Sequence, residues 1–358
     1  MEKKFYRKGT TITFAVLIFL LAVLYGCNSS EKTAYSVQMS NWPESWQSYG
    51  KPSLVNNCNL LSYGYSDKLH IWNTNNGEQT SLNVTDKDKG LFLIGNKESI
   101  AIGYSNRIEV HKLNDSSNIK VYNLPVPGKK NYQLFEEEGK LWAVYYPAFS
   151  YDNPEEIEVW NIIEQKQLIR FNLNSPKAVI QKVVLNIKAG LLVLGYGKPW
   201  LDNDLPSYVE YYAEVFSLKD GSSIYKLASH TQGVMTLSIS SDGKYVATGG
   251  SWGDGKLKLW DMITGKLLYE FKTKREPKLI SLFADWEQVR AIAFSKDNKL
   301  IAFGGGDYKI YVMNVENGQI VKTFEGANLV LNVSFKESGK ELCSISMDGF
   351  FSLWKIVD

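Results

Sequence analysis

Histidine and cysteine, the residue types that most often carry catalysis or bind metals, are scarce in this chain. Its 358 residues include only 3 His and 3 Cys, which are His70, His111, His230, Cys27, Cys58 and Cys343. So few imidazoles and thiols leave little material for a metal centre, an imidazole-based active site or a disulfide framework. We therefore predict no catalytic residue, no metal site and no bound cofactor, and we expect that the protein is not an enzyme.

Two short segments look like ligand-binding motifs but lack residues that the chemistry requires. The segment from Asp86 to Gly90 alternates acids with lysines and lacks the later glutamate that binds Ca²⁺ through two oxygens. The glycines from Gly304 to Gly306 are followed by no Lys-Ser/Thr pair, so they do not form a phosphate-binding loop. Neither segment predicts a cofactor site.

The N-terminus carries a signal for covalent modification. Basic residues from Lys3 to Lys8 precede an apolar run from Phe14 to Tyr25, which is the pattern of a secretory signal peptide. The run ends in Leu24-Tyr25-Gly26-Cys27, which resembles the lipobox of bacterial lipoproteins. This resemblance implies cleavage before Cys27, attachment of lipid to its sulfur, and a membrane-anchored protein that faces the periplasm or the cell exterior.

Three segments of the chain follow from this interpretation. We expect residues 1–26 to be the signal peptide, residues 27–34 a lipidated cysteine with a polar tether, and residues 35–358 the folded domain. The alternative is an uncleaved signal anchor from Thr10 to Gly26, whose 17 residues are close to the shortest span of a membrane.

The distribution of charge argues against a nucleic-acid-binding surface. The formal net charge of +2 results from 40 Lys and Arg against 38 Asp and Glu. Residues 1–26 hold four basic residues and one acid, a net of +3, so the rest of the chain carries 2 − 3 = −1. The mature chain therefore lacks the excess of positive charge that binds phosphates.

One pattern recurs along the body of the chain. Alternating apolar residues end in Trp or a bulky substitute at seven positions, which are Trp72, His111, Trp160, Phe216, Trp260, Met313 and Trp354. Successive endings are separated by between 39 residues (Trp72 to His111) and 56 residues (Trp160 to Phe216). A period of two in runs this short is typical of strands, and no sustained helical period is present.

The segment from Ser229 to Asp261 carries the residues of a known repeat. It contains Ser229-His230, Ser241 to Lys244, Ala247 to Gly250, Asp254 and Trp260-Asp261. Together with four short strands in each repeat, these residues resemble the WD-repeat β-propeller family. The resemblance implies an all-β, seven-bladed β-propeller of four-stranded antiparallel blades.

The two ends of the propeller are expected to complete one blade together. The chain ends four residues after Trp354, directly after the third strand of the last blade. The strand-like run from Tyr35 to Met39 precedes the first full blade and can supply the missing outer strand. We predict that this N-terminal strand closes the ring and removes a free sheet edge.

The family resemblance also assigns a structural role to four residues. In WD-repeat blades a buried network joins a Trp indole, a hydroxyl group, a His and an Asp, and the matching residues here are Trp260, Thr248, His230 and Asp254. A satisfied buried network rigidifies a fold. We interpret His230 as a member of this structural network rather than as a catalytic base.

Two cysteines remain if Cys27 is lipidated. Cys58 falls in the first blade and Cys343 in the last, which are neighbours across the ring closure. A disulfide between them would be a second link that closes the ring, and such bonds form outside the cytosol. Because Cys58 lies near a turn and the sequence does not show the Cα separation, we expect two buried thiols, with the disulfide as the alternative.

The two faces of the predicted ring differ in the length of their connections. With the strands of a blade labelled a to d from the axis outward, the a–b and c–d turns share one face, the turn face, and the b–c and d–a loops share the other, the loop face. The long insertions all belong to the loop face, and they are 41–52, 147–155, 197–207, 251–256 and 273–288.

Aromatic residues gather in these insertions. We assign six of them to a binding face, namely Phe149, Tyr151, Trp200, Trp252, Phe283 and Trp286. Trp and Tyr are enriched at binding hot spots, and long loops in a compact domain are often functional. The alternative is that the aromatic rings only pack down as lids over the propeller core.

Three functions compete for the loop face. We favour binding of a protein or peptide partner by a monomeric propeller, because the WD-repeat resemblance implies an interaction scaffold. Glycan binding is the first alternative, since Trp rings stack on sugars, and a hydrolase or lyase type of propeller enzyme is the second. The enzyme requires converging His and carboxylates, and these loops supply no histidine besides His230.

Overall fold

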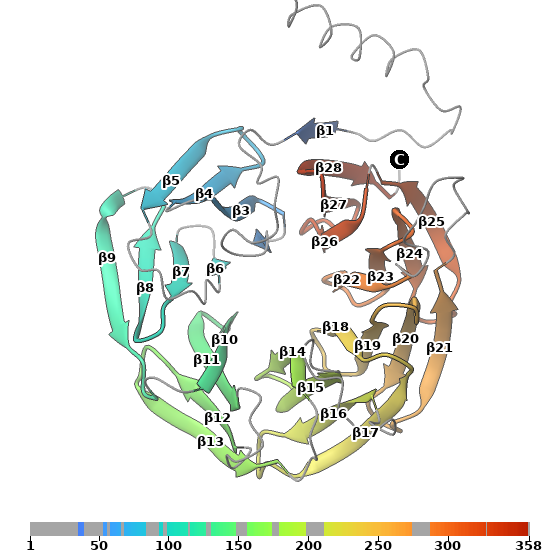
Figure 1. The fold of residues 1–358 in the computed structure, drawn as a ribbon, viewed down its shortest axis with the longest axis horizontal. Coiled ribbons are helices and arrows are strands. Elements are labelled where there is room, and N and C mark those ends of the chain that lie inside the picture. The colour runs from blue at the N-terminus through green and yellow to red at the C-terminus, as the bar shows by residue number, and fades with distance from the viewer. Residues whose placement is uncertain are drawn as a thin grey trace, which may run out of the picture. The chain divides into compact units, whose positions relative to one another are not determined.

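The structure of this protein, a computed structural model, describes thirteen stretches of the chain, which are residues 35–38, 53–55, 58–65, 68–83, 93–95, 99–113, 115–126, 130–147, 156–173, 179–197, 211–273, 287–326 and 328–356. They all belong to one compact unit, Ala34–Asp358. They form 28 strands in seven antiparallel sheets of four strands each. Figure 1 shows the sheets arranged as blades around a central axis, which is the predicted seven-bladed β-propeller. Among the described residues there is no helix that could cross a membrane.

The strands of the first four blades follow the chain from the axis outward. Blade 1 contains β2 (Ser53–Val55), β3 (Leu60–Tyr65), β4 (Lys68–Asn73) and β5 (Gln79–Asn83). Blade 2 contains β6 (Leu93–Gly95), β7 (Ser99–Gly103), β8 (Arg107–Lys112) and β9 (Asp115–Asn123). Blade 3 contains β10 (Lys130–Glu137), β11 (Lys140–Pro147), β12 (Glu156–Asn161) and β13 (Lys166–Asn172). Blade 4 contains β14 (Val179–Asn186), β15 (Leu191–Gly197), β16 (Tyr211–Ser217) and β17 (Ser223–His230).

The last three blades complete the ring. Blade 5 contains β18 (Val234–Ile239), β19 (Tyr245–Gly250), β20 (Lys256–Asp261) and β21 (Leu267–Lys272). Blade 6 contains β22 (Val289–Phe294), β23 (Leu300–Gly305), β24 (Lys309–Asn314) and β25 (Ile320–Glu325). Blade 7 contains β26 (Val330–Phe335), β27 (Glu341–Ser346), β28 (Phe350–Lys355) and, outermost, β1 (Tyr35–Gln38).

The third strand of each blade is buried on both of its faces. In β20 four consecutive residues are buried, whereas in the outer strand β13 every second residue is exposed. A blade packs against a neighbour on each side, so a strand in its middle needs apolar side chains pointing both ways. This explains why the recurring pattern in the sequence, which corresponds to these third strands, combines alternating apolar residues with a bulky final residue.

Seven hydrophobic clusters hold the blades together. Each cluster draws buried residues from two neighbouring blades, for example Trp142 and Val144 of blade 3 with Leu192 and Leu194 of blade 4. The pairing of blade 7 with blade 1 has a cluster of its own. A single blade therefore cannot bury its faces alone, and the ring is stabilised as a whole.

The N-terminal strand closes the ring as predicted. β1 pairs antiparallel with β28, with Tyr35 opposite Leu353 and Gln38 opposite Phe350. Figure 1 shows β1 alongside β28, on the outside of the last blade. The first described strand thus completes the sheet that contains the last one, and the edge of β28 is covered.

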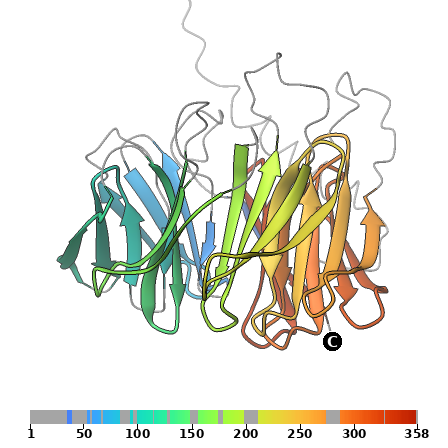
Figure 2. The ribbon, with the colours of Figure 1, turned by 90° about the horizontal axis from the view of Figure 1, so that it is seen from below.

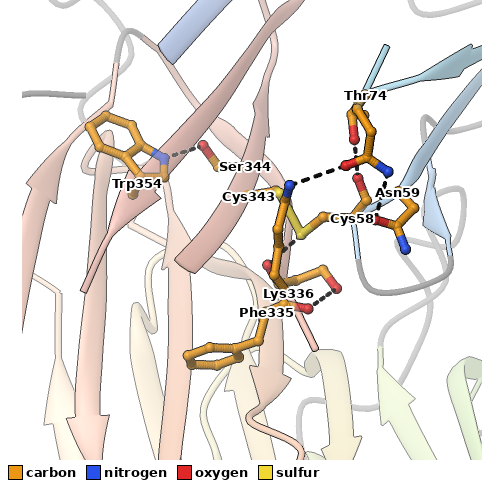
Figure 3. Close-up of a disulfide and its surroundings, with 10 residues drawn as sticks. Cys58, Asn59, Thr74, Phe335, Lys336, Cys343, Ser344 and Trp354 are labelled. Carbon is orange, nitrogen blue, oxygen red and sulfur yellow. Dashed lines mark hydrogen bonds between the residues drawn. A yellow bond between two sulfur atoms is a disulfide. The ribbon is translucent and has the colours of Figure 1, made fainter. Parts of the chain in front are cut away.

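The expectation of two buried thiols at Cys58 and Cys343 is wrong. The structure joins them in a disulfide whose Cα atoms are 6.0 Å apart (Figure 3), and the bond crosses from blade 1 to blade 7. Both cysteines are completely buried in the cluster that contains Trp72 and Phe351. Proximity arises because the ring returns the chain to its start, which brings together residues 285 positions apart.

The connections on the two faces differ in length. On the turn face no connection between successive described strands is longer than the five residues that separate Ile239 from Tyr245, whereas on the loop face β21 ends at Lys272 and β22 begins at Val289. Seen edge-on in Figure 2, the strands run between the two faces of the ring. Short, tight turns therefore define one face and long insertions the other.

Candidate functional site

Four residues of blades 4 and 5 form one continuous hydrogen-bond network. Trp260 Nε1 donates to Thr248 Oγ1 at 3.1 Å, and Thr248 Oγ1 lies 2.7 Å from Nε2 of His230. His230 Nδ1 lies 3.0 Å from Oδ2 of Asp254. The indole can only donate, so a neutral His230 with its proton on Nδ1 satisfies every bond in this chain of contacts.

The network is enclosed within the protein. The exposed fractions of His230, Thr248, Asp254 and Trp260 are 5%, 0%, 2% and 6%. Gly250 is required beside it, because a Cβ atom there would lie 2.8 Å from His230 Nδ1 and 2.5 Å from the carboxyl carbon of Asp254. The four side chains are therefore closely packed in the interior of the protein.

The ionisation of Asp254 is set by its partners. Burial alone would raise the pKa of this carboxyl group, but the hydrogen bond from His230 and the one from the Thr231 N–H, 2.7 Å long, bring the pKa below its ordinary value. Asp254 is therefore ionised at neutral pH, and it ties the loop after β19 to the end of β17.

On the loop face, the structure describes one of the six aromatic residues assigned to the binding face. Trp252 lies in the connection between β19 and β20 and is partly exposed. The other five, Phe149, Tyr151, Trp200, Phe283 and Trp286, lie outside the described residues, as does Cys27.

The loop that carries Trp252 is held from both sides. The Ser251 N–H donates to the Gly233 carbonyl at 2.9 Å, and the Gly253 N–H donates to the Glu287 carbonyl at 2.8 Å. The first bond reaches the connection that enters blade 5, and the second reaches the connection that enters blade 6. Trp252 is thus presented between two blades on a backbone that both of them restrain.

Glutamates in blades 2 to 4 form a second kind of network that sequence reasoning missed. In blade 3, Trp160 Nε1 donates to Glu158 Oε2 at 2.9 Å, and in blade 2, His111 Nε2 lies 3.1 Å from Glu109 Oε2. In blade 4, Glu214 accepts from Ser223 Oγ at 2.6 Å. The signal was available, since a glutamate precedes the strand ending by two residues in all three blades.

Blades 6 and 7 show two further arrangements. In blade 7, Trp354 Nε1 donates to Ser344 Oγ at 2.8 Å, as Figure 3 shows. In blade 6, the Tyr311 hydroxyl donates to Asp307 Oδ2 at 2.7 Å. Burial raises the pKa of Asp307, and the bond from Tyr311 offsets only part of that rise. The polar partner of the third strand therefore differs between these blades.

The described residues contain no group of three or more His, Cys, Asp or Glu side chains that could hold a metal ion. The four residues of the buried network come together, whereas the acids of the long insertions at positions 152, 202, 204 and 285 lie outside the described residues.

Comparison with known proteins matches one segment of the chain to a family. Residues 221–261 match the WD domain, G-beta repeat family. This segment contains β18 to β20 and the whole buried network. The repeat type expected from the sequence is therefore supported in the blade where its residues are complete.

Two relatives match larger parts of the chain. WD repeat and HMG-box DNA-binding protein 1 of Xenopus laevis is 27% identical over 158 residues, which cover 36% of this chain and 14% of that protein. Autophagy-related protein 16 of Arabidopsis thaliana is 22% identical over 313 residues, which cover 84% of this chain and 54% of that protein. The chain thus spans at most about half the length of these two relatives.

A solved structure shows the same fold. A chain in the crystal structure of the mitotic checkpoint complex superimposes with a TM-score of 0.64 at 13% identity, covering 92% of this chain and 96% of that one. At this identity the likeness concerns the fold alone.

Proposed function

We propose that this chain is a membrane-tethered, monomeric β-propeller that binds a protein or peptide partner on its loop face. One observation carries the proposal: the long connections lie on this face, whereas the turn face has short ones. Insertions that are not needed to join strands are where a rigid scaffold places its binding residues. The similarity to WD-repeat proteins is consistent with an interaction scaffold, although fold alone does not define a function.

Trp252 supports binding by the described part of this face. Its side chain is only partly buried, while the backbone on either side of it is hydrogen bonded to neighbouring connections. A large aromatic ring on a restrained backbone loses little conformational entropy when it contacts a partner. Such residues often dominate the free energy of binding.

Anchoring through a lipid on Cys27 is part of the same proposal. The disulfide between Cys58 and Cys343 supports export, because such bonds persist in oxidising compartments. We expect the mature protein to begin at Cys27, to carry the mass of a lipid and to sediment with membranes. Cys27→Ser should release it into the soluble fraction, and a variant that still sediments with membranes like the wild type would contradict the lipid anchor.

The binding face is tested by quantitative crosslinking and recovery from membranes. We expect Trp200→Ala/Trp252→Ala/Trp286→Ala to reduce recovery of the specific partners by about tenfold or more, because aromatic hot spots contribute 2 kcal/mol or more each. The matched control removes exposed aliphatic groups from the outer strand β9 and the turn face, as Val121→Ala/Ile163→Ala/Ile263→Ala, where the exposed fractions are 56%, 48% and 73%.

The comparison of the two triple variants decides the outcome. If both melt like the wild type and the tryptophan variant still recovers the same partners, the loop face is not the binding face. Equal losses in both variants would point to a general surface effect instead. A glycan array on the wild type separates the glycan alternative, since specific binding of a sugar that the tryptophan variant loses would replace the protein partner.

A further inference from the structure

Four successive blades share a bulge at the start of their innermost strand. The register of the a–b pairing shifts directly after the first residue of β18, β22 and β26, and after the second residue of β14. The extra residues are Gln181, Met235, Arg290 and Leu331, and each of them is partly exposed. Because an innermost strand begins where a d–a connection ends, all four lie at the loop face beside the ring axis, where Figure 1 shows β14, β18, β22 and β26.

Arg290 is the charged member of this set, and its neighbours direct it toward the axis. Val289 is fully buried in the cluster between blades 5 and 6, and Ala291 is buried in the cluster between blades 6 and 7. The other edge of β22 is hydrogen bonded to β23. The remaining direction for the bulged residue is the free edge of β22, which faces the axis.

A buried amide holds the guanidinium by one nitrogen. Arg290 Nε donates to Gln288 Oε1 at 3.0 Å. Gln288 is completely buried, and its Nε2 has no hydrogen-bond partner among the described residues. With Nε engaged, the two terminal nitrogens of Arg290 form a free fork, and the amide N–H of Gln288 is a further donor close to it.

The guanidinium lacks an anionic partner in the described part of the chain. The nearest acid in sequence is Glu287, which pairs with Lys272 at 3.2 Å. Burial lowers the pKa of Arg290, and no carboxylate acts against that effect. A charge that is partly removed from water and has no counter-ion lowers the stability of the fold. An anionic group of a bound ligand would compensate the charge of Arg290.

We propose that Arg290 binds a carboxylate group of the partner peptide, with its two terminal nitrogens donating to the two carboxylate oxygens. The proposal rests on the function proposed above and names the chemistry of one contact within it. A guanidinium fork matches a carboxylate in geometry and in charge, one against one. A phosphate carries up to two charges, which one guanidinium does not balance.

The loop that carries Trp252 lies next to the segment that leads into Arg290. The Gly253 N–H donates to the Glu287 carbonyl at 2.8 Å. An acidic residue next to an apolar one, or a C-terminal apolar residue with its free carboxylate, would match both Arg290 and Trp252. These two sources of the carboxylate share the same chemistry and are separated by the test.

The test begins with a synthetic library of random peptides, half with a free C-terminal carboxylate and half amidated, selected on the full chain in detergent. We expect the wild type to enrich peptides with Asp or Glu at one position, or peptides with the free C-terminus. Arg290→Gln should lose this preference, and Arg290→Lys should keep part of it. Arg170→Gln, which removes an arginine paired with Glu156 far from the axis, is the matched control and should behave like the wild type.

An enriched peptide then allows a direct measurement of affinity. Replacing its acid by the amide, either Glu→Gln in the peptide or carboxylate to carboxamide at its C-terminus, should weaken binding to the wild type by about tenfold or more. The same replacement should have little effect on binding to Arg290→Gln. The position of the effective replacement identifies the source of the carboxylate.

The outcomes separate this inference from the proposed function. Enrichment of peptides without any preference for a carboxylate, or an equal preference in Arg290→Gln, overturns the role of Arg290 and leaves peptide binding intact. Enrichment of no peptide at all overturns both. Thermal melting shows whether the variant is folded. Because Arg290 has no counter-ion to lose among the residues that the structure describes, we expect Arg290→Gln to melt at the same temperature as the wild type or higher. A clear decrease in melting temperature would assign Arg290 a structural role.

Discussion

Blades 3 and 5 satisfy the tryptophan at the end of their third strand in different ways. In blade 3, Trp160 donates to Glu158 of the same strand at 2.9 Å. In blade 5, the bond from Trp260 to Thr248 continues to His230, the last residue of β17 in blade 4. The first network stays within one blade, whereas the second joins two. The same bulky ending can therefore serve local rigidity or the coupling of neighbours.

The ring contains other links between blades that are not made of apolar contacts. The disulfide joins blades 7 and 1, and Lys336 of blade 7 donates to Asn75 of blade 1 at 3.3 Å. β1 adds a strand from the N-terminal side to the last blade. We expect links between blades to act on the stability of the whole ring and links within a blade to act locally. The four changes that follow test this difference.

Removal of β1 should have the largest effect. Deleting residues 34–40 exposes the edge of β28 and opens the ring, so we expect the single cooperative melting transition to be lost. Differential scanning calorimetry measures it, with deletion of residues 28–33 as the control. A deletion variant that melts like the wild type would show that the strand is dispensable for closure.

Asp254→Ala should follow in size, with a loss of about 3 to 5 kcal/mol in the free energy of unfolding, because it leaves His230 and the Thr231 N–H without their buried partner. Hydrogen exchange should increase in both blade 4 and blade 5. Exchange that increases in blade 5 alone would contradict the coupling of the two blades. Asp254→Asn, which keeps an acceptor, is the milder control.

The pH dependence of stability checks the same link. The pKa of Asp254 in the folded protein is lowered, so its contribution is fully present above the unfolded pKa of about 4 and is lost as the pH falls through the lower folded pKa. Between about pH 6 and pH 3 the wild type should therefore lose more stability than Asp254→Asn. Parallel losses in denaturant titrations would count against this role of the carboxylate.

Opening the disulfide should cost about 2 to 4 kcal/mol, since it closes a loop of 285 residues and restricts the unfolded chain. Cys58→Ser/Cys343→Ser and the reduced wild type should unfold at the same, lower concentration of denaturant. Cys27→Ser is the control and should not change the midpoint. Thiol titration of the unfolded, unreduced chain should not detect these two cysteines, and free thiols there would disprove the bond.

Glu158→Ala should have the smallest effect, about 1 to 3 kcal/mol, through loss of the acceptor for the partly buried Trp160 N–H. Hydrogen exchange should increase in blade 3 and not in blades 2 and 4. Glu158→Gln keeps an acceptor and should lose less. Spread of the effect into the neighbouring blades would remove the distinction between the two kinds of network.

Much of the architecture could be predicted because it depends on short-range patterns. Endings such as Trp72 and Trp354 recur with the spacing of a four-stranded unit, and the run that begins at Tyr35 has the alternation of a strand. Hydrophobic burial rewards this alternation wherever the strands pack, so the pattern alone indicates seven blades and the closing strand. The candidate binding face was predicted on the same basis, from the length and aromatic content of its insertions.

Other features depend on distances that no local pattern contains. The bond between Cys58 and Cys343 requires a Cα separation of 6.0 Å that the closed ring produces. The position of Arg290 on the axis side of β22 follows from a one-residue shift in the pairing with β23, which depends on both strands. The glutamates before three of the strand endings were visible, but only the packing shows that they bind within their own blade.

The sequence alone determined the repeat, the number of blades and the closing strand, because these follow from the periodic burial of apolar side chains along each strand. Tertiary structure decided which polar groups meet, from the network of His230 to the disulfide and the fork of Arg290. The physical reason is range: apolar burial is non-directional and tolerates degenerate repeats, whereas hydrogen bonds and disulfides need atoms within a few ångströms and in a set direction.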